Sequence, residues 1–115
     1  MSVRELSTSE NNEVTFVNRF TLRVAPDEFE RAFARTTAFM RRQPGFLGHT
    51  LLRHVDHQDR YVNVARWRDV ASFRRAVAHP DFPHHAAALR ALCGSEPNLY
   101  TPRQVEPAGD QSATG

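Results

Sequence analysis

The sequence predicts an α+β fold in which helices cover one face of an antiparallel sheet. Residues 14–22 alternate apolar and polar side chains, and residues 61–67 are rich in β-branched and aromatic residues, as strands are. Residues 29–40 repeat apolar side chains at helical spacing until Pro44-Gly45, and a second helical region follows Asp69. The resulting order, β-α-β-β-α-β, is the ferredoxin-like pattern.

The first predicted strand, Val14 to Leu22, and the helix that follows it each have one apolar face. Pro26 suits the first turn of the helix, and Asp27 suits its positive end. One side of the strand carries Val14, Phe16, Asn18, Phe20 and Leu22. One side of the helix carries Phe29, Ala32, Phe33, Thr36, Phe39 and Met40.

The second half of the chain predicts three more strands and a helix interrupted by prolines. These elements are Phe46–Val55, Tyr61–Trp67, Val70–His79 with a further helical piece His84–Leu92, and Asn98–Val105. Asp69 can cap the helix, and Pro80 and Pro83 break it. Pro102 favours an edge position for the last strand, because proline lacks the N–H that a central strand needs.

Length and composition indicate a single domain, which we predict over residues 14–105, with flexible tails at 1–13 and 106–115. The net charge is only +2 and the arginines are scattered among carboxylates, so nucleic-acid binding is not expected. No apolar run reaches the ~18 residues of a membrane span. The single Cys93 fits a reducing compartment, and we predict a cytoplasmic location.

The third predicted strand is apolar on both faces, which predicts a homodimer. Val62 and Val64 alternate with Tyr61, Asn63 and Ala65. In this topology, helices cover only one face of the sheet, so a second apolar face marks an interaction surface. We therefore expect two sheets to pack together across a dimer axis, as a dimeric α+β barrel.

Asn18 is the most informative residue for function, because it interrupts an apolar row where an amide must find hydrogen bonds. Asn63 and Trp67 are four residues apart in the third strand and share a face. The first and third strands are expected to be neighbours, so the two amides and the indole can converge in one pocket. The alternative is a structural role, with the amides bonded to each other or to nearby backbone and Trp67 in the core.

The stretches 14–20, 43–46 and 61–67, together with 89–92 and 95–100, resemble the antibiotic biosynthesis monooxygenase family. The likeness is greatest to anthrone oxygenases of aromatic polyketide pathways. The Pro-Gly-Phe turn at 44–46 is common in the family and weak alone, whereas the combination with Asn18, Asn63 and Trp67 is fairly specific. The resemblance implies that these three residues are catalytic. We further predict substrate binding by Phe16, Phe33, Met40 and Arg90.

The resemblance implies a cofactor-independent monooxygenase that uses O₂ to oxidise a polyphenolic, anthrone-type polyketide intermediate to a quinone. In this chemistry the substrate supplies the electrons, so neither a metal nor a bound flavin is expected. Two alternatives stay open. One is oxidative C–C cleavage of an angucycline ring, with reduced flavin or hydroquinone as electron source. The other is a dimeric module that binds a polyketide intermediate without oxidising it.

The histidines leave two further alternatives. His79, His84 and His85 lie near Asp81 and could form a two-histidine, one-carboxylate metal site, although a helix junction on the surface is a more ordinary place for them. A haem-degrading relative of the same fold uses an Asn, a Trp and a helical His, which Asn18, Trp67 and His84 or His85 could imitate. Cys93 is expected to be a buried, small apolar residue.

Overall fold

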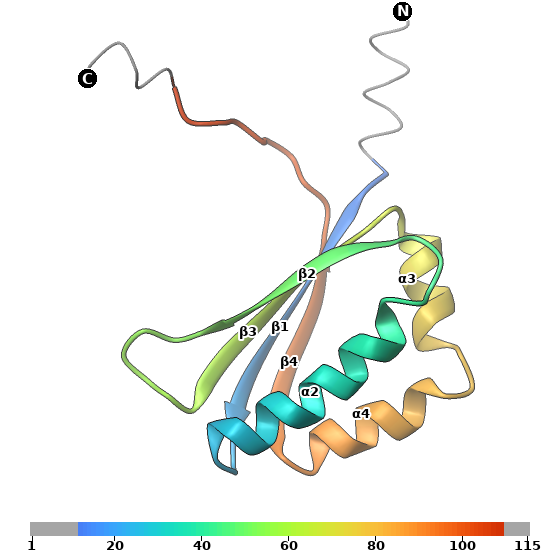
Figure 1. Cartoon of the computed structure of the whole chain (residues 1–115). Coiled ribbons are helices and arrows are strands. Elements are labelled where there is room, and N and C mark those ends of the chain that lie inside the picture. The colour runs from blue at the N-terminus through green and yellow to red at the C-terminus, as the bar shows by residue number, and fades with distance from the viewer. Residues whose placement is uncertain (1–11, 110–115) are drawn as a thin grey trace, which may run out of the picture.

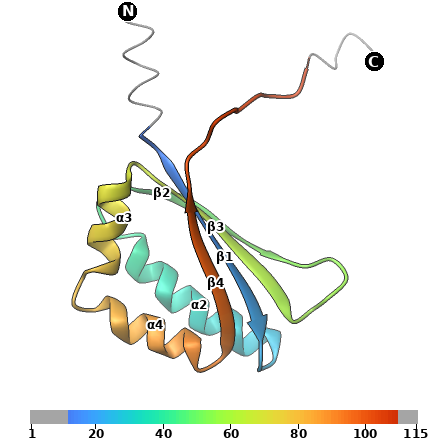
Figure 2. The ribbon, with the colours of Figure 1, turned by 180° about the vertical axis from the view of Figure 1, so that it is seen from behind.

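The computed structural model describes residues 12–109. Its elements are β1 (Val14–Leu22), α2 (Pro26–Met40), β2 (Phe46–Arg53), β3 (Arg60–Trp67), α3 (Val70–Val77), α4 (Phe82–Arg90) and β4 (Cys93–Tyr100). The strands form one antiparallel sheet in the order β2-β3-β1-β4. The helices lie on one side of this sheet, and no described element covers the other side (Figures 1 and 2). The predicted α+β class and the adjacency of the first and third strands are confirmed.

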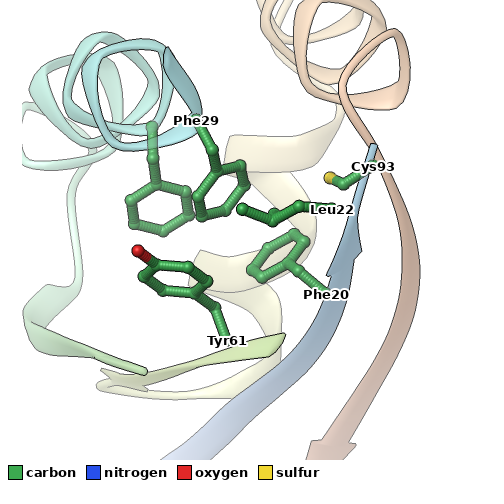
Figure 3. Packing of buried hydrophobic residues seen from close by; sticks show 6 residues of the cluster. Phe20, Leu22, Phe29, Tyr61 and Cys93 are labelled. Carbon is green, nitrogen blue, oxygen red and sulfur yellow. The ribbon is translucent and has the colours of Figure 1, made fainter. Parts of the chain in front are cut away.

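Two apolar clusters join the sheet to the helices at opposite ends of β1. One cluster contains Phe20, Leu22, Phe29, Phe33, Tyr61 and Cys93, and five of these residues are labelled in Figure 3. The other contains Val14, Ala65, Trp67 and Ala76. Asn18 and Asn63 lie between these clusters along the strands, so the middle of the sheet faces a space that the core does not fill.

The last strand differs most from the sequence prediction. It runs from Cys93 to Tyr100 rather than from Asn98 to Val105, so it includes Gly94 and Pro97. Proline fits there because β4 pairs only with β1 and is an edge strand, on which alternate N–H groups need no partner. Pro102, which suggested the edge position, lies beyond the strand.

The helices and the other strands end within a few residues of their predicted limits. Helix α4 begins at Phe82 rather than His84, because Pro83 occupies its first turn, where a missing N–H costs nothing. Helix α3 ends at Val77 and β2 ends at Arg53, two residues before each predicted end. The predicted flexible tails lie largely outside the described residues and stay predictions.

The junction between α2 and β2 depends on Gly45 and a buried serine. Gly45 has φ +91°, and a Cβ there would lie 2.3 Å from the Ser72 hydroxyl oxygen, so only glycine fits. Asp69 caps α3 as predicted, because its Oδ1 accepts a hydrogen bond of 2.7 Å from the Ser72 N–H. The Ser72 hydroxyl and this backbone bond lower the pKa of Asp69. The contact anchors α3 beside the strand that carries Trp67.

Candidate functional site

A cavity of about 290 Å³ lies between the sheet and the helices, near the lower end of the range for small-molecule pockets. Its lining is mostly apolar and comes from β1, β3, β4 and all three helices. All seven predicted site residues border it: Phe16, Asn18, Phe33, Met40, Asn63, Trp67 and Arg90. The structure therefore brings these side chains together, while their roles in catalysis and binding stay predictions.

Asn18 and Asn63 are direct cross-strand partners in β1 and β3. Side chains at such positions have Cβ atoms roughly 5 Å apart on the same face of a sheet. Asn63 is 8% exposed. The Asn18 Oδ1 atom is buried without a hydrogen-bond partner, which costs free energy. No hydrogen bond joins the two amides, whereas Trp67 lies in the core as the structural alternative expected.

His49 of β2 contacts Asn63 of the neighbouring strand β3, and it was not among the predicted site residues. Its Nδ1 lies 3.0 Å from Asn63 Oδ1. The ring packs between Phe33 and Phe46, at centroid distances of 5.8 and 6.2 Å. The register of β2 is irregular between Phe46 and Gly48, so Phe46 and His49 face the same side although they are three residues apart. Gly48 within a strand was the one available signal of such a bulge.

Trp67 forms one wall of the cavity and is almost completely buried, at 1% exposure. Its indole makes edge contacts with Phe46 and Phe73, at centroid distances of 5.2 and 5.8 Å. Phe73 also packs against Phe16, at 4.9 Å. These rings give the cavity flat aromatic surfaces, against which a polycyclic aromatic ligand can stack.

Comparison with known proteins identifies the family. Residues 14–89 match the model of the antibiotic biosynthesis monooxygenase family. The chain belongs to this family. It is 57% identical over 105 residues to the deoxynogalonate monooxygenase of Streptomyces nogalater, a match that covers 90% of this chain and 89% of that relative. The predicted membership is thereby confirmed, and so is the prediction that the chain is an oxygenase.

Solved structures agree with this membership. SnoaB, a cofactor-independent oxygenase from Streptomyces nogalater, superimposes with a TM-score of 0.81 at 60% identity, over 84% of this chain and 99% of SnoaB. A conserved protein from Methanosarcina mazei shares the fold alone, with a TM-score of 0.69 at 11% identity over 84% of this chain and 99% of its own. In residues 12–109, no helix is long and apolar enough to cross a membrane.

Arg90 and Cys93 border the cavity where α4 meets β4. The Arg23 guanidinium donates to the Arg90 carbonyl oxygen and, at 3.4 Å, to that of Cys93, and so ties these two elements to the end of β1. Cys93 is buried, and its thiol donates to the Leu89 carbonyl oxygen at 3.3 Å. Burial raises the pKa of this thiol, so it stays protonated, as expected for a small packing residue.

The remaining predicted alternatives concern histidines, which the structure places away from the cavity. His79 and His85 pack on Phe39, at centroid distances of 5.1 and 4.9 Å, and His84 is exposed. Among the described residues, no group of three or more His, Cys, Asp or Glu side chains could hold a metal ion.

A haem-degrading relative is also found among known proteins. A mycobilin-producing haem oxygenase of Mycobacterium tuberculosis is 36% identical over 62 residues, which are 54% of this chain and 59% of that relative. However, neither His84 nor His85 borders the cavity that Asn18 and Trp67 line. Among the described residues, the Asn, Trp and His of the haem-degrading alternative therefore do not line one cavity together.

Proposed function

We propose that this family member is a cofactor-independent monooxygenase that oxidises an anthrone-type aromatic polyketide intermediate to a quinone with O₂. The observation that carries the proposal is the pair of facing amides, Asn18 and Asn63, on the wall of an aromatic cavity beside Trp67. The high identity to a deoxynogalonate monooxygenase and to a cofactor-independent oxygenase supports the same chemistry. A cytoplasmic location is part of the proposal.

The polar atoms of the cavity fit a substrate that has a hydroxyl group and a carbonyl or enolate oxygen. The unpartnered Oδ1 of Asn18 can only accept a hydrogen bond, so it suits a phenolic O–H. The N–H groups of Asn63 suit an oxygen on which negative charge develops. Arg90, the only arginine on the described cavity lining, is exposed and can pair with a substrate phenolate.

The proposed reaction needs little from the protein beyond binding and charge stabilisation. The anthrone loses a proton from its methylene carbon, and the resulting enolate transfers one electron to O₂. Recombination of the radical pair forms a C–O bond, and protonation gives a hydroperoxide. Loss of water then leaves a carbonyl group, which completes the quinone. Preorganised amide donors lower the energy of the enolate, and apolar walls keep water from it.

Oxygen consumption with dithranol, a model anthrone, tests the proposed function. We expect the purified protein to consume one O₂ per anthrone and to release the quinone, at a rate that exhaustive chelation does not change. The rate should exceed that of the same solution with heat-denatured protein. A protein that binds dithranol, seen by quenching of Trp67 fluorescence, but does not accelerate oxygen uptake would be a binding module instead.

We also propose that the chain forms a homodimer through the uncovered face of its sheet. Cross-strand pairing places Val17 beside Val64, and Val62 beside Leu52, on the face opposite to the helices. Leu52 is 47% exposed. An apolar strip on a sheet without a helix layer is suited to packing against a second copy.

Analytical ultracentrifugation at micromolar concentration is expected to show a dimer. Leu52→Asp should shift dissociation to higher protein concentration, because a carboxylate would be buried between two sheets. Val55→Asp is the matched control, since Val55 is 97% exposed in the β2–β3 turn and not on this strip. A wild-type protein that sediments as a stable monomer would exclude the dimer.

A further inference from the structure

We propose that His49 is a positioning residue that fixes the orientation of the Asn63 amide, so that its N–H groups face the substrate. This inference rests on the proposed function of the cavity. It comes from one contact, the 3.0 Å separation between His49 Nδ1 and Asn63 Oδ1, and from the place of each residue. Asn63 borders the cavity, whereas His49 does not.

The contact defines which hydrogen-bonding groups remain for a ligand. A carbonyl oxygen of an amide only accepts hydrogen bonds, so Nδ1 of His49 must carry the hydrogen and donate it. With Oδ1 turned toward His49, the N–H groups of Asn63 point away from His49 and are available to another partner. Without His49, rotation by 180° about the last side-chain bond would exchange oxygen and nitrogen with little change in shape.

The orientation matters because the opposite residue presents the complementary group. The Oδ1 of Asn18 is buried and has no hydrogen-bond donor, so the amide opposite it should present a donor rather than a second oxygen. If Asn63 also turned its oxygen inward, two acceptors would face each other, and a developing enolate would meet no donor. His49 thus determines that Asn63 on β3 presents a donor opposite the acceptor of Asn18 on β1.

The surroundings of His49 suit a fixed ring. The imidazole is half-buried, and it packs on Phe33 of α2 and Phe46 of β2. Its outer side borders a shallow groove between β2 and α2. These two aromatic contacts restrict rotation of the imidazole. The hydrogen bond from this fixed ring can therefore set the orientation of the Asn63 amide.

A double-mutant cycle on dithranol oxidation tests the inference. His49→Leu should lower kcat about tenfold and leave KM nearly unchanged, because the amide is misoriented while the substrate contacts persist. His49→Gln, whose side-chain N–H₂ can donate to Asn63, should recover part of the rate. In the Asn63→Ala background, His49→Leu should have no further effect, because it acts through that amide. His57→Leu, in the exposed turn, is the matched control.

Two outcomes separate the inference from the proposed function. If Asn63→Ala loses turnover but His49→Leu keeps it, or if the two losses multiply, the positioning role is wrong and the function stands. If the wild-type protein does not oxidise dithranol, the proposed function is wrong. A nitrogen NMR spectrum then tests the hydrogen bond between His49 and Asn63 without any measurement of activity. We expect a hydrogen on His49 Nδ1 whose signal shifts in Asn63→Ala; an unprotonated Nδ1 at neutral pH would overturn the proposal.

Discussion

Asn63→Ala is expected to lower kcat for anthrone oxidation by about 10²-fold, because it removes a donor that faces the developing enolate oxygen. The same change should cost stability. It leaves Nδ1 of His49 without the acceptor that lies 3.0 Å away; because His49 is only half-buried, the cost should not exceed the roughly 1–3 kcal/mol of a fully buried unsatisfied donor. Steady-state oxygen consumption and urea denaturation on the same preparation measure the two effects separately.

Asn12→Ala is the matched control for this experiment. Asn12 is an exposed asparagine just before β1, and its removal should change neither turnover nor the free energy of unfolding beyond about 0.5 kcal/mol. A variant Asn63→Ala that stays folded and oxidises dithranol at the wild-type rate would remove Asn63 from the catalytic set.

Much of this site could be predicted because it depends on strand order and on alternation. The ferredoxin-like order makes the first and third strands neighbours, and period-two alternation places Asn18, Asn63 and Trp67 on the helix side. The sequence did not define the register, however. Only the structure shows that Asn18 lies directly opposite Asn63 rather than two residues away.

His49 escaped prediction because strand parity fails at a bulge. Counting alternately from Phe46 puts His49 on the face opposite to Phe46, away from the cavity. The irregular register at Gly48 reverses this assignment, and both residues face the helices. The last strand was misplaced for a related reason, because Gly94 and Pro97 suggest a turn in isolation but are compatible with an edge strand.

The unpartnered atom of Asn18 leads to the prediction that best separates function from structure. Asn18→Leu replaces the amide by an apolar group of similar size and shape. Oδ1 has no hydrogen-bond partner, so its removal breaks no hydrogen bond. The free energy of unfolding of Asn18→Leu should therefore be unchanged or higher than that of the wild type, by up to about 1 kcal/mol.

Turnover of Asn18→Leu should nevertheless fall about 10²-fold, since the substrate hydroxyl loses its acceptor and meets an apolar group. Functional residues often carry such a stability cost, whereas structural ones do not. The measurement is a pair of values for one variant, the urea midpoint and the rate of dithranol oxidation. Reduced stability with undiminished turnover would mean that Asn18 supports the sheet and has no part in the reaction. A gain in stability with the expected loss of rate would place the Asn18 amide among the groups that contact the substrate.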